Sequence, residues 1–312
     1  MRRRSTRSLS MLVAAALAAL AAPPLGAQQV ADTAWRPSVA RPAHGRGAGP
    51  VVYVDEAHNN FHTAAGRFAP FARLLEADGY RVRRFQAPFS RESLDSVRVL
   101  VVANAIARQN VGAWRRPVAA AFTEEEMTAV AEWVQGGGSL LLIADHMPMA
   151  GAAMELAGKF GVFYVDGFAI DPRNDWDGVT VFRRGDGSLV RHAITDGRSA
   201  GERVDSVATF TGSAMTRMVA VDSLFVLPHP TVVMMPQAAW QFSDSTPYLV
   251  GSHLLQGAVR TVGRGRVAFF GEAGMFTAQR QNGKPMGLND PRAAGNAQFI
   301  LNVLHWLTGL LK

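Results

Sequence analysis

The sequence predicts an α/β fold with a doubly wound, mostly parallel sheet. Three observations support this fold class: short and continuous apolar runs, segments of helical periodicity between these runs, and polar residues directly after several of them. Continuous apolar runs are typical of parallel strands that are covered on both faces, and the alternation of strand and helix predicts parallel pairing. The chain has 312 residues, 48% of them hydrophobic, which is enough for one large core.

The first 27 residues have the pattern of a signal peptide. Four arginines precede an apolar core at 11–22, which is too short to span a membrane, and the residues LGA before Gln28 offer a cleavage site. An uncleaved N-terminal anchor is the alternative. We therefore expect an exported protein, periplasmic or secreted, with no stable membrane span after processing.

The charge and the cysteine count exclude several classes of function. Removal of residues 1–27 takes away four arginines and no acidic residue, so the formal charge falls from +7 to +3. This charge predicts no nucleic-acid partner. The chain has no cysteine, so it can form no disulfide and has no thiol nucleophile. The sequence does not define an oligomeric state.

The domain is expected to begin after a flexible linker. Residues 28–49 are rich in Pro, Gly, Ala and Arg without periodicity, which is typical of a tether. A single domain then fills residues 50–312. In its first half, helices are expected at 68–78, 123–133 and 150–160, and strands at 51–54, 80–85, 97–103, 139–144 and 162–165.

The middle of the domain, residues 171–247, has a different pattern. Turn signals are dense and the apolar runs are short and rich in β-favouring residues, which indicates an antiparallel insertion or extension of the sheet rather than a separate domain. The runs at 179–182 and 189–190 flank Asp186-Gly187 and predict a hairpin.

The α/β pattern returns after residue 247. Strands are expected at 248–255, 258–262 and 266–270, and a last helix at 296–310. Between them, the loop at 274–296 is long and rich in hydrogen-bonding residues. A long flexible loop of this kind could close over a polyol or sugar.

Four segments carry a resemblance to known proteins: VQGGGSLLLIADH, HAITDGR, GRVAFFGEAGMFTAQ and NAQFILNVLHWLTG. They resemble an uncharacterised exported bacterial family of the class I glutamine-amidotransferase-like superfamily, which is related to trehalose-utilisation-type domains. The resemblance covers roughly residues 50–310 and implies a flavodoxin-like sheet with helices on both faces. Members with glutaminase activity carry a nucleophilic cysteine after a strand, whereas here that turn reads DHMP. Glutamine hydrolysis through a thioester is therefore excluded.

Polar side chains follow three of the expected strands. Because the carboxyl ends of parallel strands meet at one edge of a sheet, we expect these side chains to lie close together. The candidate catalytic residues are Asp55, His58, Asp145, His146 and Glu272. The candidate ligand-binding residues are Glu56, His62, Gln279, Asn282 and Asn289.

Two kinds of chemistry suit this set of residues. A divalent metal such as zinc or manganese could be held by His58, His146 and Glu272, and could activate water for hydrolysis. Without a metal, a carboxylate could orient a histidine as general base. A purely structural interpretation remains beside both, because Asp and Asn after strands often cap helices, and loop histidines often only form hydrogen bonds.

The leading functional hypothesis is recognition of a small polar ligand, with a carbohydrate as one candidate, at the carboxyl edge of the sheet and without glutaminase activity. The alternative is a hydrolase, metal-assisted or using general acid/base chemistry, with the same residues. The second alternative is a non-catalytic scaffold. The sequence decides neither the ligand nor whether a reaction takes place.

Overall fold

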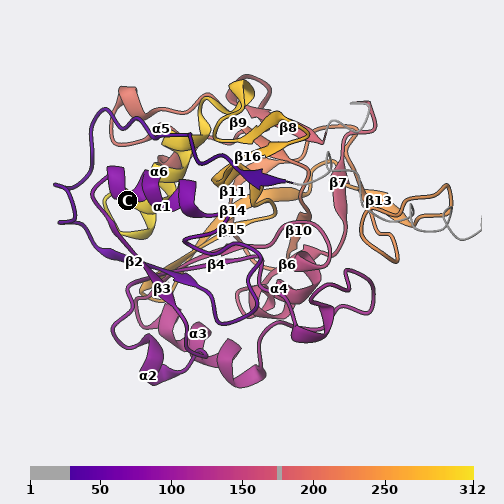
Figure 1. The fold of residues 1–312 in the computed structure, drawn as a ribbon, viewed down its shortest axis with the longest axis horizontal. Coiled ribbons are helices and arrows are strands. Elements are labelled where there is room, and N and C mark those ends of the chain that lie inside the picture. Colours follow the sequence, from indigo (N-terminus) through magenta and orange to yellow (C-terminus); the bar gives the residue numbers. More distant parts are fainter. Residues whose placement is uncertain (1–28, 174–177) are drawn as a thin grey trace, which may run out of the picture.

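The computed structural model describes residues 29–173 and 178–312, which form a mixed α/β fold around a large sheet (Figure 1). The expected signal peptide, residues 1–27, lies outside the described residues. The nine-stranded sheet has the order β3-β2-β4-β5-β15-β14-β10-β6, and β11 also pairs with β14. Its strands are β2 (Val51–Asp55), β3 (Arg81–Phe85), β4 (Val99–Ala103), β5 (Ser139–Ile143), β6 (Val162–Val165), β10 (Ala214–Arg217), β11 (Asp222–Val226), β14 (Leu255–Val262) and β15 (Gly265–Phe270).

The sheet has a parallel half and an antiparallel half. The strands β3, β2, β4, β5 and β15 are parallel neighbours, whereas β14, β10, β6 and β11 pair in antiparallel fashion. The parallel strands are the apolar runs of the sequence; all five residues of β4 and of β5 are buried. The strand expected at 162–165 does form, as β6, but it lies at the antiparallel edge of the sheet and not among the parallel strands.

Helices cover both faces of the parallel half. Figure 1 shows α1 and α6 on one side of the sheet and α2, α3 and α4 on the other. Successive side chains of a strand alternate between the two layers, so Val101 packs in the cluster with α1 and α6, whereas Leu100 and Val102 pack in the cluster with α3 and α4. The helices are α1 (Ala69–Ala77), α2 (Arg91–Leu94), α3 (Glu124–Gln135), α4 (Met149–Gly158), α5 (Ala193–Asp196) and α6 (Asn296–Leu307).

Helix α3 begins where its sequence predicts. The Thr123 side chain accepts a hydrogen bond from the backbone N–H of Glu126, and the Glu126 carboxylate accepts one from the backbone N–H of Thr123. This capping box satisfies two backbone donors that the first turn of a helix leaves without partners. It also fixes the position of the Glu126 carboxylate.

The middle segment extends the main sheet and adds smaller ones, as the sequence predicts. Besides β10 and β11, it contributes β8 (Val179–Arg183), which pairs with β9 (Ser206–Phe210), and β12 (Val232–Met234). Strand β12 lies between β7 (Phe168–Ile170) and β13 (Tyr248–Val250).

The predicted hairpin of residues 179–182 with 189–190 is wrong. The partner of β8 is β9, and residues Arg184–Asp186 form a 3₁₀ turn. Leu189 is buried and forms an isolated bridge with Phe225, so the core takes this side chain away from the expected hairpin.

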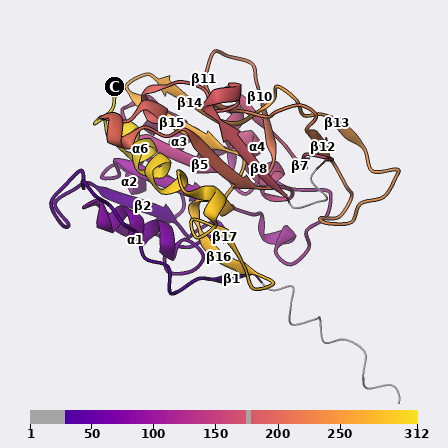
Figure 2. The ribbon, with the colours of Figure 1, turned by 90° about the horizontal axis from the view of Figure 1, so that it is seen from above.

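Two segments that the sequence presents as flexible are folded against the domain. Strand β1 (Val30–Ala31) pairs with β16 (Ala278–Gln281), which forms a hairpin with β17 (Lys284–Gly287), as Figure 2 shows. Gly49 donates a hydrogen bond to the Gly79 carbonyl, and His44 packs edge-on against the Tyr80 ring. The described part of the expected tether is therefore attached, and much of the expected mobile loop at 274–296 is a hairpin.

The remaining short elements are 3₁₀ turns at Arg108–Asn110, Ala200–Glu202, Gly274–Phe276 and Pro291–Ala293. Within the described residues, none of the helices combines the length and the apolar character that crossing a membrane requires.

Candidate functional site

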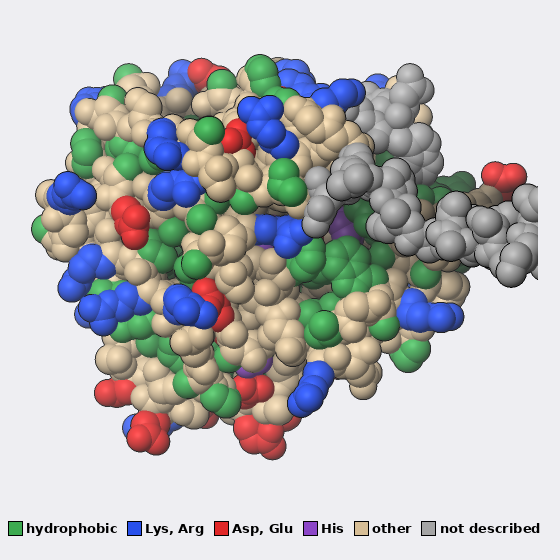
Figure 3. All heavy atoms as spheres, viewed as in Figure 1, with side chains coloured by type: hydrophobic (Ala, Val, Ile, Leu, Met, Phe, Trp, Pro, Cys, Tyr) green, Lys and Arg blue, Asp and Glu red, His purple; other side chains and the backbone are tan. Residues whose placement is uncertain are grey.

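The ends of four neighbouring parallel strands bring polar residues to one edge of the sheet. The strands β2, β4, β5 and β15 run in the same direction. Asp55 is the last residue of β2, Asn104 follows β4, Asp145 follows β5 by two residues and Glu272 follows β15 by two residues. The carboxyl edge expected from the sequence thus exists, and Figure 3 shows histidine side chains (purple) near the middle of one face, next to a basic side chain (blue) and hydrophobic ones (green).

The first part of this edge is a clamp around His58, which we call the His58 clamp: Asp55, His58 and Glu126. The Nδ1 atom of His58 is 2.9 Å from both carboxylate oxygens of Asp55, and its Nε2 atom is 2.9 Å from Oε1 of Glu126. Asn60 also donates a hydrogen bond to Asp55 at 2.9 Å. The rings of Phe89 and Phe122 pack on the imidazole, with centroids 4.4 and 4.8 Å from its own.

The surroundings of His58 favour its protonated form. Burial acts to lower the pKa of His58, but hydrogen bonds and charge from Asp55 and Glu126 outweigh burial, so its pKa is raised above 6.5. A protonated imidazole is a donor at both nitrogens, which matches the two carboxylates that it faces. His58 therefore ties the loop after β2 to the first turn of α3, and neither ring nitrogen is available as a base or as a metal ligand.

The second part of the edge is built around His62. The backbone N–H of Asp145 can only donate, so the side-chain oxygen of Asn104 must accept it, at 2.9 Å. The amide nitrogen of Asn104 then faces Nδ1 of His62 at 3.1 Å and donates to it. The pKa of His62 is lowered to about 3, first by burial and then by the nearby charges of Arg67 and His146. A neutral imidazole that accepts at Nδ1 carries its proton on Nε2.

The Nε2–H group of His62 has no acceptor among the described residues. This nitrogen is buried and without a hydrogen-bond partner. A buried donor without a partner is unfavourable by about 1–3 kcal/mol. Ten buried side-chain nitrogen or oxygen atoms of the described residues lack a hydrogen-bond partner, and this one lies among the candidate residues at the carboxyl edge of the sheet.

Asp145 and His146 lie beside His62 and are both half-buried. The Asp145 carboxylate accepts the backbone N–H of His146 at 2.8 Å, and Nδ1 of His146 donates to the carbonyl of Met147 at 2.7 Å. With Nδ1 as donor, a neutral His146 has a lone pair on Nε2. When His146 is neutral, the two imidazoles of this part present one donor, His62 Nε2–H, and one acceptor, His146 Nε2.

Aromatic rings surround His146. Its ring is stacked on Phe168, with centroids 4.5 Å apart and an angle of 15° between the planes. Trp240 packs edge-on at 4.7 Å and Trp114 at 6.1 Å. Trp240 is 53% exposed and has a positive φ of 65°, which is unusual for a bulky residue. We call Asn104, His62, Asp145 and His146, together with these three rings, the His62 centre.

Glu272 is buried at the end of β15. Its carboxylate accepts hydrogen bonds from the backbone N–H groups of Gly274 and of Met275, the latter at 2.7 Å. Burial, and then the charge of Asp145, raise the pKa of Glu272 to about 8. Glu272 is therefore close enough to Asp145 to sense its charge, and both causes favour its protonated form, while the backbone N–H groups of Gly274 and Met275 favour the carboxylate. Its exposed fraction is only 1%, so in this conformation it supports the edge from within.

Four residues expected to bind a ligand have structural contacts elsewhere. Glu56 pairs with Arg84 and accepts the backbone N–H of Ala64 at 2.9 Å. Gln279 donates to the Thr277 hydroxyl at 2.7 Å, and Asn289 donates to Asp32 at 2.9 Å. Asn282 has a positive φ of 52° and, with Gly283 at 76°, forms the two-residue turn between β16 and β17. These contacts give the four residues structural roles, while the buried side-chain oxygens of Gln279 and Asn289 have no partner among the described residues.

The metal site expected at His58, His146 and Glu272 does not form. His58 belongs to the clamp, and both of its ring nitrogens face carboxylates. Within residues 29–173 and 178–312, no group of three or more His, Asp or Glu side chains is arranged to hold a metal ion.

Three contributors escaped the sequence-based list of site residues. Glu126 belongs to the capping box that begins α3, and its second carboxylate oxygen binds His58. Asn104 follows the apolar run of β4, so the rule that identified Asp145 and Glu272 would have found it. Trp240 gives no sequence signal, because a tryptophan in a loop has no periodicity.

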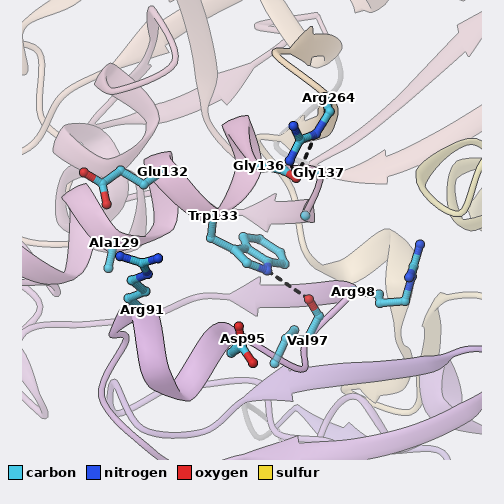
Figure 4. Close-up of a pocket in the computed structure, with 11 residues that line it drawn as sticks. Arg91, Asp95, Val97, Arg98, Ala129, Glu132, Trp133, Gly136, Gly137 and Arg264 are labelled. Carbon is cyan, nitrogen blue, oxygen red and sulfur yellow. Dashed lines mark hydrogen bonds between the residues drawn. The ribbon is translucent and has the colours of Figure 1, made fainter.

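A pocket lies at the opposite edge of the sheet, where the parallel strands begin. It is lined by residues just before β4, β5 and β15, including Arg98, Gly138 and Arg264. Figure 4 shows the Trp133 indole in its middle, donating to the Val97 carbonyl at 2.9 Å, while Arg264 donates to the Gly136 carbonyl. It contains none of the candidate residues, and we place the candidate site at the carboxyl edge.

Comparison with known proteins identifies the fold. No family model matches the chain, and a search of curated proteins finds no match. The chain is similar to the solved mmIFT52 N-terminal domain, with 12% identity, a TM-score of 0.57, and coverage of 82% of this chain and 97% of that one. A ThuA-like protein from Bacteroides uniformis has 11% identity, a TM-score of 0.47 and coverage of 88% and 96%. A cytoplasmic protein from Salmonella typhimurium has 13% identity, a TM-score of 0.46 and coverage of 82% and 98%. At these identities, the likeness to the first of them shows the fold alone.

Proposed function

We propose that the chain binds a small polar ligand, such as a carbohydrate, at the His62 centre. The observation that carries the proposal is the buried Nε2–H of His62, a donor of fixed orientation without an acceptor among the described residues. An oxygen of a ligand would satisfy this donor, and the lone pair of His146 Nε2 and the carboxylate of Asp145 would accept hydrogen bonds from ligand hydroxyls.

The rings around His146 support a ligand of this kind. Small-molecule sites are built mainly from apolar and aromatic side chains with a few oriented polar groups. Trp240 and Trp114 supply the aromatic surface next to Asp145, His146 and His62. The apolar faces of a sugar ring could pack on an exposed indole while its hydroxyls meet the polar groups.

The position of the centre in the fold also supports the proposal. The parallel strands, numbered by their order in the chain from β2 onward, have the spatial order 2-1-3-4-5. This is the flavodoxin-like order, in which ligands bind at the carboxyl edge of the sheet. We therefore propose a flavodoxin-like, glutamine-amidotransferase-like domain that lacks the cysteine nucleophile and acts after export to the periplasm or the exterior.

A thermal-shift screen with neutral and acidic monosaccharides and polyols tests the proposal. A ligand at 100 times its Kd stabilises the folded protein by about 2.7 kcal/mol, which is a readily measured rise in Tm. We expect at least one compound to raise the Tm, and the rise to shrink in Asp145→Asn and His146→Gln. Asp244→Asn, in an exposed loop, is the matched control and should respond as the wild type. Failure of the whole panel, or equal shifts in all variants, would contradict the proposal.

A second candidate is general acid/base catalysis by Asp145 and Glu272. The observation in its favour is the raised pKa of Glu272 next to Asp145, because two carboxyl groups with separated pKa values can divide the roles of acid and base. Turnover of chromogenic glycosides or esters, lost in both Asp145→Asn and Glu272→Gln, would identify this function. Binding without turnover would leave ligand recognition as the function.

A further inference from the structure

Arg67 is a basic side chain without a counter-ion beside the His62 centre. Among the described residues it forms no ion pair and no hydrogen bond, and its Nε atom is buried. Its guanidinium lies over the ring of Phe61, with 4.0 Å between Cζ and the ring centroid. A contact with an aromatic face attracts the cation but gives its N–H groups no acceptor.

Arg67 and His62 belong to the same region. The charge of Arg67 is close enough to His62 to lower the pKa of that residue. Phe61, which carries the guanidinium, is in edge contact with His62 at 5.5 Å and with Trp114 at 5.2 Å. The region therefore contains two kinds of N–H donor without acceptors, the Nε–H of Arg67 and the Nε2–H of His62.

We infer that Arg67 and His62 form an anion subsite for a carboxylate group of the ligand. A guanidinium presents paired donors that match the two oxygens of a carboxylate, and such charge-assisted hydrogen bonds are roughly twice as strong as neutral ones. The Nε2–H of His62 adds a donor that stays uncharged. The inference rests on the proposed function and narrows its ligand class from polar molecules in general to small carboxylates, such as acidic sugars.

The distribution of charge explains why an anion fits at this end of the centre. The carboxylates of the His58 clamp are occupied by His58 and Asn60. Burial raises the pKa of Glu272, and Asp166, which is also near His146, pairs with Arg116. Asp145 is then the acidic group beside His146 that has no ion pair among the described residues. A ligand with a carboxylate at one end and hydroxyls at the other would match Arg67 and His62 with the first and Asp145 with the second.

Binding of matched probes to the full chain tests the inference. The probes are D-glucuronate, D-galacturonate, acetate, D-glucose and inorganic phosphate, at constant ionic strength. We expect a uronate to bind at least tenfold more tightly than D-glucose, and Arg67→Gln to weaken the uronate at least tenfold. Arg83→Gln removes the same charge from an exposed site on β3 and should change the Kd less than twofold. His62→Phe, which keeps a ring but removes the donor, should also weaken the uronate.

Each other outcome overturns a defined part of the inference. If the uronate and glucose have equal Kd values, and Arg67→Gln leaves the Kd of the uronate unchanged, the anion subsite is overturned and the proposed function stays in place. Phosphate binding in an Arg67-dependent way while carboxylates do not bind overturns the carboxylate assignment. No binding of any probe overturns the inference and the proposed function together. Arg67→Lys, which keeps the charge without the paired donors, serves if Arg67→Gln does not fold, and it should bind the uronate with intermediate affinity.

Discussion

His58 and His62 are four residues apart on one loop, yet the fold gives them opposite environments. Both are buried, with 7% and 3% of their surfaces exposed. His58 has a carboxylate at each ring nitrogen and a raised pKa, whereas His62 has an amide at one nitrogen, nothing among the described residues at the other, and a pKa of about 3. Both ring nitrogens of His58 therefore have hydrogen-bond partners, whereas Nε2–H of His62 has none among the described residues.

The two environments distinguish a structural histidine from a functional one at a strand edge. A histidine whose hydrogen-bonding capacity is used up stabilises the fold, and its loss is measured as stability. A histidine with a fixed and unused donor keeps one hydrogen bond for a ligand, whatever its packing contributes to the fold.

Replacement of His58 should have the largest effect on stability. His58→Ala leaves the buried Asp55 and the mostly buried Glu126 without their shared cation, so we expect a loss of about 3–5 kcal/mol in the free energy of unfolding, measured with urea. The exposed His253→Ala should cost far less, and a similar loss in both variants would remove the distinction.

The stabilisation from His58 should also depend on pH. Because the pKa of folded His58 is raised, its contribution is complete below pH 6.5, the unfolded value, and is lost as the pH rises through the folded value. The difference in unfolding free energy between the wild type and His58→Gln should therefore shrink above pH 6.5. A difference that grows with pH would contradict the protonated clamp.

Glu272 should make the protein less stable as the pH rises from about 4.5 to about 8. In this range the unfolded chain has released the proton of this carboxyl, whereas folded Glu272, with a pKa of about 8, retains it. Glu272→Gln should flatten the pH dependence, whatever its effect on absolute stability. Glu76 is exposed on α1, so Glu76→Gln should leave the pH dependence of the unfolding free energy unchanged. If Glu272→Gln also had the pH dependence of the wild type, Glu272 would be ionised in the folded protein.

Replacement of Asn104 should lower the stability more than replacement of Asn59, which has the same backbone φ. Asn104→Ala removes the acceptor of the Asp145 N–H and the donor to His62, so we expect a loss of about 2 kcal/mol. Asn59 has the same φ of 49° but is exposed and forms a 3.2 Å hydrogen bond to Ile106. Asn59→Ala should cost about 1 kcal/mol, and equal losses would mean that backbone conformation, rather than the hydrogen bonds, accounts for the effect.

Trp240 should have the smallest effect on stability and a clear one on binding. Because half of the indole is exposed, Trp240→Ala should change the free energy of unfolding by less than about 1 kcal/mol. The same change should reduce the rise in Tm that a bound ligand causes. Tyr248 is exposed on β13, so Tyr248→Ala is the control. If it reduced the ligand-induced rise in Tm as much as Trp240→Ala does, the ligand would bind away from Trp240.

The parallel half of the fold follows from the sequence because its signals are local. The apolar runs of β4 and β5 and the capping box at Thr123 each act within a few residues. The pairing of β8 with β9 could not be predicted in this way, because about 20 residues separate the two strands and Leu189 is drawn into the core by Phe225. The hairpin at residues 278–287 is similar, since its pairing with β1 joins segments about 250 residues apart.

The sequence predicts that the candidate residues share one edge of the sheet. It does not predict that they divide into the His58 clamp and the His62 centre. That Asp55, Asp145 and Glu272 lie along one edge follows from parallel pairing alone. That His58 is saturated depends on Glu126, 68 residues away, whose position is set by the start of α3. That His62 keeps a free donor depends on the amide of Asn104, whose orientation is set by the backbone of Asp145. Such partners are defined only in three dimensions.

The contrast between His58 and His62 is tested most directly by long-range ¹H–¹⁵N spectra of the histidine rings. The variants His58→Gln and His62→Phe assign the signals. We expect His62 to show the neutral Nε2–H form without titration from pH 5 to 8, and His58 to be protonated at both nitrogens at pH 6. A His62 that titrates near pH 6.5, or that carries its proton on Nδ1, would contradict the account.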